Sequence, residues 1–225
     1  MNNGLRIYSQ PVITQIFGIY EKNVTDALLK VCIDPQKILV AGLHNGYTAI
    51  KLAKLYNVPV VGIEANPTLC DDAIKTIDIN KLKDITVVRN SIGYENSKFG
   101  ISGDENGMIY SSSEASPDTI FSLNPIVPFS DIVNRYGFQH TAGNLLIMDI
   151  EGFEESVLDY EGVTVFNCFD HIMLEWHSLA IKKKFIDAFS ACGGDAGSWK
   201  IVEIPNMRSR NDFHNGHILF IRINQ

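Results

Sequence analysis

A strand, turn, helix and second strand between residues 37 and 67 constrain the fold more than any other part of this chain. The apolar run 37–42 leads into a turn that holds Gly42 and Gly46, and a second apolar run over 58–65 carries Glu64. Glycine lacks a Cβ, so both glycines can turn the backbone sharply and bring it close to a ligand. The amino-terminal amides of the next helix would point at that ligand. This segment predicts a β-α-β unit of an α/β fold.

Glu64 indicates what kind of ligand the turn would bind. It follows Gly42 by about 20 residues, where nucleotide-binding β-α-β units place the acid that accepts hydrogen bonds from ribose hydroxyls. The third glycine of the dinucleotide fingerprint is absent, and so is the phosphate-loop motif. A cofactor with a ribose and no phosphate suits the turn better, and S-adenosylmethionine is the common one. The alternative is that the glycines only pack a strand against a helix.

The composition excludes several classes of protein. The 225 residues fit one α/β domain, with 45% hydrophobic and 20% charged residues. A net charge of −7 argues against a broad nucleic-acid-binding face, so no nucleic-acid partner is expected. No apolar run is long enough to cross a membrane, and the amino terminus has no signal core, so a cytoplasmic location is expected. The four cysteines lack the Cys-x-x-Cys spacing of a zinc site.

Seven apolar segments predict the strands of one sheet. The first three of them are apolar and do not alternate with polar residues, which is typical of parallel strands covered on both faces. The last two are joined by about a dozen residues without a helical pattern, so we expect them to be antiparallel. The predicted strands are 37–42, 58–65, 85–90, 144–150, 170–177, 199–204 and 217–223.

Helical spacing of apolar residues predicts the segments between the strands. The predicted helices are one or two within 11–32, followed by 48–55, 68–80, 132–136, 154–158 and 181–191. Residues 1–36 are interpreted as an N-terminal helical segment that packs on a domain formed by 37–225. Residues 94–123 are rich in polar residues and glycine and are interpreted as a hairpin insertion, with its turn at 104–107.

Five motifs, in this order along residues 17–223, resemble those of FkbM-type methyltransferases. They are Gly42-x-His44-x-Gly46, Ile63-Glu-Ala-Asn-Pro67, Asn90-Ser-Ile-Gly93, Asp149-Ile-Glu-Gly-Phe-Glu154 and Leu174-Glu-Trp-His177. The resemblance implies a Rossmann-like class I methyltransferase fold, with a seven-stranded, mostly parallel sheet, an antiparallel last strand and helices on both faces. It also implies S-adenosylmethionine as the cofactor and a hydroxyl group as the usual methyl acceptor.

The resemblance also implies the positions of the cofactor contacts. Gly42, His44, Gly46 and Glu64 with Ala65 would surround the cofactor, Asn90 and Ser91 would lie near its adenine, and Asp149 would face its methionine end and the methyl group. Four positions depart from the family's usual motifs. Val40, Leu43 and His44 stand where Asp, Ala and Asn are usual, and Ile147 stands where a lysine is common.

Asp149, Glu151 and His177 are the candidate catalytic residues. The first two follow the strand 144–150, and His177 ends the strand 170–177. Strand alternation places Glu175 and His177 on one face, so they could converge with the two acids. His177 is the first candidate for the base that takes the hydroxyl proton, because imidazole titrates near neutral pH. Asp149 would orient groups, with a base role also open. The alternative for His177 is a strand end fixed by a backbone hydrogen bond.

A divalent cation bound by these acids and the histidine is a further alternative. Oxygen-rich clusters suit such ions, but no spacing in the sequence matches a metal motif, so no metal is predicted. His214 and His217 have a spacing seen in zinc sites, yet without partners they are interpreted as surface or strand-end residues.

The sequence thus predicts an S-adenosylmethionine-dependent methyltransferase that modifies an oxygen of a small molecule or glycan. A methyltransferase-fold protein that lost turnover and acts as a binding or regulatory module is the alternative. A nicotinamide-dependent reductase ranks third, because the third glycine is missing. The acceptor's identity is left open, as is the formation of a homodimer.

Overall fold

A seven-stranded sheet forms the centre of the computed structural model, which describes residues 22–31, 34–94, 99–101, 109–111, 124–140, 142–192, 198–204 and 216–223. The strand order is β10-β11-β9-β8-β1-β2-β3. The strands are β1 (Lys37–Ala41), β2 (Val60–Glu64), β3 (Ile85–Arg89), β8 (Asn144–Met148), β9 (His171–Trp176), β10 (Ser198–Ile204) and β11 (Gly216–Ile223). All seven predicted strands are present.

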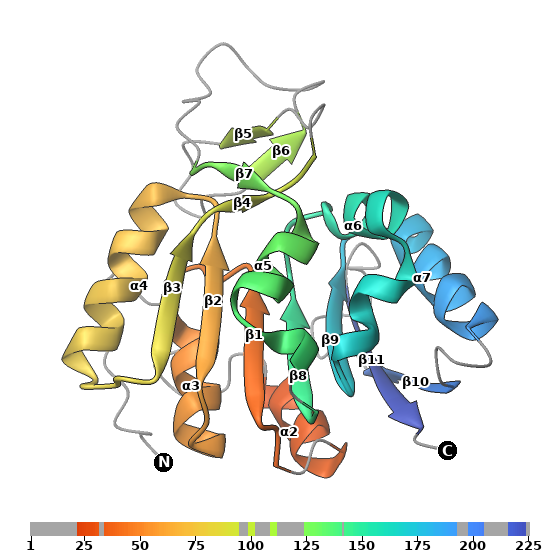
Figure 1. Cartoon of the computed structure of the whole chain (residues 1–225), viewed down its shortest axis with the longest axis horizontal. Coiled ribbons are helices and arrows are strands. Elements are labelled where there is room, and N and C mark those ends of the chain that lie inside the picture. The colour runs from red at the N-terminus through yellow and green to blue at the C-terminus, as the bar shows by residue number, and fades with distance from the viewer. Residues whose placement is uncertain are drawn as a thin grey trace.

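The directions of the strands also confirm the prediction. β3, β2, β1, β8 and β9 pair in parallel with one another. β11 is antiparallel to both of its neighbours, β9 and β10, so only β11 runs against the rest of the sheet. The carboxyl ends of the five parallel strands therefore lie along one edge, which is the upper edge in Figure 1.

Helices cover both faces of the sheet (Figure 1). They are α2 (Lys22–Val31), α3 (Tyr47–Tyr56), α4 (Pro67–Ile79), α5 (Phe129–Arg135), α6 (Glu154–Glu161) and α7 (Leu179–Ala191), with the 3-10 helices η1 (Phe138–His140) and η2 (Val163–Cys168). Each predicted helix is present within the described residues, whereas the 3-10 helices η1 and η2 were not predicted. Residues 11–21 of the first predicted helical region lie outside the described residues.

Alternate residues of β1 face two separate hydrophobic cores. Leu39 and Ala41 pack in the core that α5, α6, η2 and α7 cover, and the aromatic side chains gather there. Ile38 and Val40 pack in the core that α2, α3 and α4 cover. Because both faces are buried, the strand reads as a continuous apolar run in the sequence.

Two small sheets lie beyond the carboxyl edge of the main sheet (Figure 1). β4 (Ser91–Ile92) pairs in parallel with β7 (Ile126–Val127), and this sheet was not predicted. β5 (Phe99–Ile101) and β6 (Ile109–Ser111) pair in the antiparallel manner of a hairpin. The predicted turn at 104–107 lies outside the described residues, and the division of the chain into domains stays a prediction.

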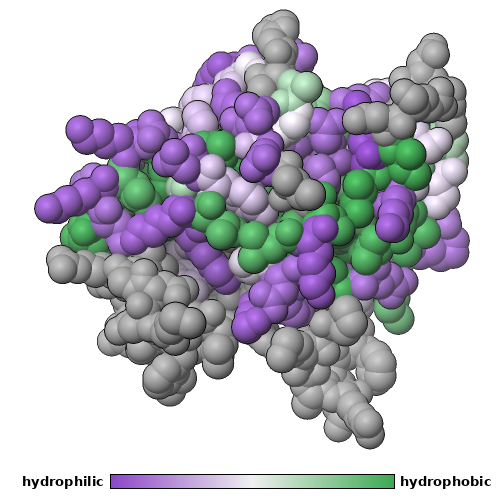
Figure 2. Space-filling model, turned by 90° about the horizontal axis from the view of Figure 1, so that it is seen from below, coloured by the Kyte–Doolittle hydropathy of each residue, from purple (hydrophilic) through white to green (hydrophobic). Residues whose placement is uncertain are grey.

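The hydropathy of the end opposite the carboxyl edge reflects the layered fold. In Figure 2, seen from below, hydrophobic residues form a band between hydrophilic margins. Such a band is expected where an apolar sheet lies between two helical layers with polar outer faces. Among the described residues, no helix combines the length and the apolar character that a membrane crossing requires.

Candidate active site

The turn between β1 and α3 brings the backbone of β1 against the backbone that follows β8. Gly42 has a φ of +90°, and a Cβ placed on it would lie 1.6 Å from the carbonyl oxygen of Asp149. Gly46 has a φ of +82°, and a Cβ there would lie 3.3 Å from the Cβ of Ala73. Both positions therefore favour glycine, for the sharp turn and for close packing against Asp149 and α4, while the approach of a ligand to them stays a prediction.

Two departures from the usual family motif lie in the core and not on the ligand side of this turn. Val40 is buried, and Leu43 is buried against Gly62. A Cβ on Gly62 would lie 2.5 Å from the Cδ1 atom of Leu43, so the larger side chain at position 43 fills space that Gly62 leaves. The hydrophobic residues at positions 40 and 43 thus belong to the core.

His44 lies at the tip of the turn. Its side chain is exposed and its backbone adopts a left-handed φ of +51°. Histidine is among the residues that tolerate this conformation best after glycine. Its backbone N–H donates to the Oε2 atom of Glu64 at 2.7 Å, which ties the turn to the end of β2.

Glu64 ends β2 and connects two loops at the carboxyl edge. Besides the bond from His44, its Oε1 atom accepts the backbone N–H of Asn66 at 2.8 Å. Its side chain is 7% exposed. Burial raises the pKa of this carboxyl, although the N–H groups of Asn66 and His44 favour its charged form. Each carboxylate oxygen has a second lone pair, so the group can still accept hydrogen bonds from a ligand's hydroxyls.

Asn90 and Ser91, the residues predicted to lie near the adenine, directly follow β3, the next strand along the edge. The Ser91 hydroxyl is buried and donates to the Asn124 carbonyl at 3.0 Å, and the Asn90 amide donates to the Pro125 carbonyl at 2.9 Å. Asn124 in turn donates to the Glu64 carbonyl, and its N–H donates to the carbonyl of Ala65. These bonds fix the loop around the expected adenine position, while the contacts of Ala65, Asn90 and Ser91 with a cofactor stay predictions.

Asp149, Glu151 and His177 converge at the ends of β8 and β9. We call these three residues the acid–histidine trio. The Nε2 atom of His177 lies 3.4 Å from the Oδ1 atom of Asp149 and 3.4 Å from the Oε2 atom of Glu151. Glu151 has a φ of +54° and Gly152 a φ of +95°, so the chain reverses directly after β8. This reversal turns Glu151 back toward the histidine, as the sequence predicted for these residues.

Glu154, the first residue of α6, contacts the far side of the same imidazole. Its Oε1 atom lies 3.3 Å from the Nδ1 atom of His177 and accepts the Ile150 N–H at 2.8 Å. Its side chain is fully buried. Burial opposes protonation of His177, but Glu154 and then Glu151 and Glu175 outweigh it and raise the pKa of the imidazole. Burial also raises the pKa of Glu151, against the opposing influence of His177.

Glu175 and His217 extend the cluster away from the trio. Glu175 pairs with His217 across β9 and β11, and the Oε2 and Nε2 atoms are 3.2 Å apart. Burial opposes the ionisation of Glu175, but His217, His177 and Asp149 together hold its pKa below the usual value. His217 is the second residue of β11, in agreement with its interpretation as a strand-end residue, but its pairing with Glu175 was not predicted. Only the register of β11 on β9 reveals this partner, and no sequence spacing does.

The turn and the trio lie next to each other at the carboxyl edge of the sheet. The carbonyl of Asp149 touches Gly42, and the electrostatic influence of His44 reaches Glu151. Open α/β sheets bind ligands in the crevice beyond the carboxyl ends of their strands. This edge therefore offers a buried carboxylate suited to a ribose at the end of β2, and a cluster of titratable groups at the ends of β8 and β9.

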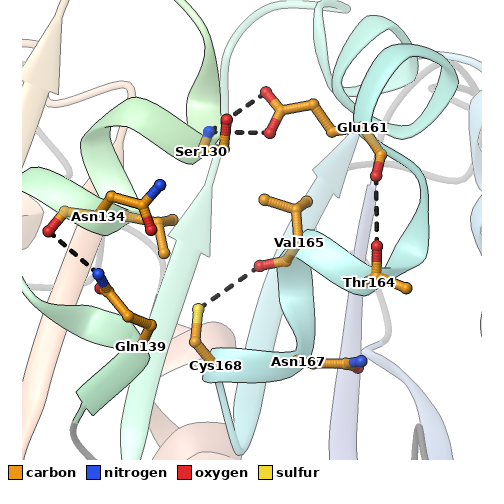
Figure 3. A pocket seen from close by; sticks show the side chains of 9 residues that line it. Ser130, Asn134, Gln139, Glu161, Thr164, Val165, Asn167 and Cys168 are labelled. Atoms are coloured by element: carbon orange, nitrogen blue, oxygen red, sulfur yellow. Dashed lines mark hydrogen bonds between the residues drawn. The ribbon is translucent and has the colours of Figure 1, made fainter.

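A separate cavity of about 490 Å³ lies on the face that α5 covers. Figure 3 shows that several of its polar groups pair with each other. Glu161 accepts the Ser130 N–H, the Gln139 amide donates to the Asn134 carbonyl, and the Cys168 thiol donates to the Val165 carbonyl.

Solved structures with a similar fold are methyltransferases. The METTL16 MTase domain has a TM-score of 0.59 at 11% identity, covering 99% of this chain and 75% of that one. An rRNA methylase from Streptococcus thermophilus has a TM-score of 0.55 at 8% identity, with 89% and 95% covered. SMU.1697c from Streptococcus mutans, a putative methyltransferase solved with S-adenosylhomocysteine (SAH), has a TM-score of 0.53 at 8% identity, with 89% and 96% covered. The fold is that of the class I methyltransferases.

The sequence narrows this class to one family. The sequence model of a protein family, described as the methyltransferase FkbM domain, matches residues 41–209 of this chain. The matched residues include the turn, Glu64 and the whole trio. The chain belongs to the FkbM methyltransferase domain family. No curated protein matches it.

Proposed function

We propose that this protein is an S-adenosylmethionine-dependent methyltransferase that methylates an oxygen of a small molecule or glycan. One observation carries the proposal. The chain belongs to a methyltransferase family, and its Glu64 carboxylate accepts a hydrogen bond from the glycine turn. The acid–histidine trio lies at neighbouring strand ends on the same edge of the sheet. S-Adenosylmethionine supplies an electrophilic methyl group when it is bound.

The residues present fit this cofactor. Gly42 and Gly46 give the turn its left-handed backbone, and the exposed His44 lies between them. Glu64 is placed to accept hydrogen bonds from ribose hydroxyls. The family and the SAH bound to the similar Streptococcus mutans protein support the same cofactor. The acid that the family usually has at position 40 is absent, but this does not argue against cofactor binding, because the Val40 side chain packs in the core.

The trio is proposed as the acceptor end of the site. A hydroxyl acceptor must lose a proton when it is methylated, and Asp149, Glu151 and His177 are the titratable groups that adjoin the turn. The backbone of Asp149 adjoins Gly42 of the turn, which supports the proposal that Asp149 faces the methionine end of the cofactor. Catalysis by such a site would come mainly from holding the acceptor oxygen in line with the methyl group.

An oxygen of a small molecule or glycan is favoured over a nucleic acid by charge. Four carboxylates lie within the cluster formed by the trio, Glu154, Glu175 and His217, and the whole chain carries a net charge of −7. A polyanionic acceptor would be repelled by this cluster. The rRNA methylases among the similar structures share the fold at 8–10% identity, which does not assign an acceptor.

Transfer of a labelled methyl group tests the proposal. The purified chain is incubated with methyl-labelled S-adenosylmethionine and separate pools of hydroxylated metabolites, oligosaccharides and total RNA. We expect label in a hydroxyl compound with wild type and with Glu203→Gln, which alters an exposed acid, and a strongly reduced signal with Asp149→Asn. Label in RNA alone would contradict the proposed acceptor. SAH binding without transfer to any pool would favour a binding module.

A further inference from the structure

We propose that the acid–histidine trio binds one divalent transition-metal ion through a carboxylate oxygen of Asp149, a carboxylate oxygen of Glu151 and the Nε2 atom of His177. The sequence spacing predicted no metal, because the three ligands come from two strand ends and an intervening turn. They become neighbours only when β8 and β9 pair and the chain reverses at Glu151 and Gly152.

The distances between the three ligand atoms suit a small cation. Nε2 lies 3.4 Å from an oxygen of each acid, and one ligand atom from each residue can be chosen so that all lie within 4.8 Å of one another. Ligand atoms arranged tetrahedrally at about 2.1 Å from a metal lie about 3.4 Å apart. An ion can therefore be placed between the imidazole and the carboxylates with small side-chain adjustments.

Glu154 provides an independent argument for a cation. Its side chain is fully buried, one oxygen faces the Nδ1 atom of His177, and its Oε2 atom has no hydrogen-bond partner among the described residues. A histidine that binds a metal through one ring nitrogen commonly donates its other N–H to such a carboxylate. With the proton on Nδ1, the Nε2 lone pair faces an oxygen of Asp149 and an oxygen of Glu151, as a metal-binding imidazole requires.

The donor set indicates the type of ion. An imidazole nitrogen suits first-row transition metals, and two carboxylates suit harder ions such as Mn²⁺, so Mn²⁺ or Zn²⁺ fits better than Ca²⁺, which takes oxygen ligands. Three protein ligands leave at least one coordination position open for an exogenous oxygen.

The open position gives the metal a role, and this step rests on the proposed function. A hydroxyl bound there would have a lower pKa and could release its proton to solvent at neutral pH. His177 would then act as a ligand and not as the base that the sequence favoured. The acceptor would accordingly be a compound whose hydroxyl, alone or with a neighbouring oxygen, can bind a metal.

Mn²⁺ binding without any cofactor tests the site directly. The full-length chain is freed of metal with EDTA and dialysed, and free Mn²⁺ is followed by electron paramagnetic resonance during titration. We expect one saturable site that Zn²⁺ displaces and Ca²⁺ does not. Glu151→Gln and Asp149→Asn should each weaken binding at least about tenfold, as should Glu154→Gln, which changes the support of the histidine.

Matched controls separate this site from general acidity. Glu203→Gln removes an exposed carboxylate, and His171→Gln removes a histidine at the other end of β9. Both should bind Mn²⁺ as wild type does. The proposal is overturned if millimolar Mn²⁺ gives no saturation, if Ca²⁺ competes equally with Zn²⁺, or if Glu151→Gln and Asp149→Asn both bind Mn²⁺ like wild type.

A thermal-shift measurement with SAH in EDTA distinguishes this proposal from the proposed function. A shift by SAH together with no Mn²⁺ binding would overturn the metal site and leave the methyltransferase proposal standing. Saturable Mn²⁺ binding at the trio together with no shift by SAH would support the metal site and count against the methyltransferase proposal.

Discussion

The backbone N–H of His44 donates to the Glu64 carboxylate at 2.7 Å, so the residue expected to bind the cofactor's ribose also fixes the turn that would surround it. The other carboxylate oxygen accepts the N–H of Asn66, which caps α4 with its side chain. One buried acid thus holds together the loops after β1 and β2. Its position is set before any ligand binds, which reduces the entropy that binding would cost.

Glu64→Ala should therefore destabilise the protein even without a ligand. Two backbone N–H groups lose their acceptor, and each unsatisfied buried donor costs about 1–3 kcal/mol. We expect the free energy of unfolding in urea to fall by about 2–4 kcal/mol. The control Glu203→Ala removes an exposed acid and should change it by less than about 0.5 kcal/mol. Equal values for the two variants would show that Glu64 does not hold the loops.

Gly42→Ala should be more destabilising than the same change at Gly152. Both residues have a left-handed φ, so both variants carry backbone strain of about 1–3 kcal/mol. Only at Gly42 would the new Cβ meet another atom, the carbonyl oxygen of Asp149, whereas nothing lies within 4 Å at Gly152. Urea unfolding of both variants measures the difference. A Gly42→Ala variant no less stable than Gly152→Ala would contradict the close approach of these two backbones.

Leu43 and Gly62 should be energetically coupled. Gly62→Ala places a Cβ against the Leu43 side chain, so alone it should destabilise the protein by about 1–3 kcal/mol through overpacking. In a Leu43→Ala background the clash is removed and the same change should have a smaller effect. A double-mutant cycle on the free energy of unfolding should give a coupling of at least about 0.5 kcal/mol. Additive effects would contradict the conclusion that the Leu43 side chain fills the space that Gly62 leaves.

His171 should make stability depend on pH. Burial lowers the pKa of this imidazole, against the smaller opposing effects of its bond to the Val31 carbonyl and of the Asp170 charge. The unfolded chain then binds more protons than the folded one as the pH falls through about 6.5, so stability should decrease on acidification. His171→Gln should have a shallower decrease in unfolding free energy between about pH 7 and pH 5. Parallel curves would show that His171 does not contribute.

The sequence predicted most of the main sheet because its strands are apolar and unalternating. β1, β2 and β8 are buried on both faces, and buried parallel strands have this pattern. The antiparallel direction of β11 followed from the short connection to β10. By contrast, β4 and β7 have two residues each, which is too short for a periodic pattern to predict them.

The site was predicted where a motif lies within one segment, and missed where it depends on pairing between segments. Asp149 and Glu151 follow β8 directly, so the sequence could place both at the carboxyl edge. His217 reaches Glu175 only through the register of β11 on β9. The complete burial of Glu154 depends on how α6 packs, which the local sequence does not determine.

Calorimetric titration with SAH tests the central claim, that Glu64 binds the ribose of the cofactor. Wild type, Glu203→Gln and His177→Ala should bind with similar affinity, because neither changed residue is placed at the ribose. Glu64→Gln keeps the size of the side chain but loses the charge and an acceptor oxygen, and should weaken binding at least about tenfold, the equivalent of one hydrogen bond to a charged group. Equal affinities for wild type and Glu64→Gln, in samples that are equally folded, would contradict the claim.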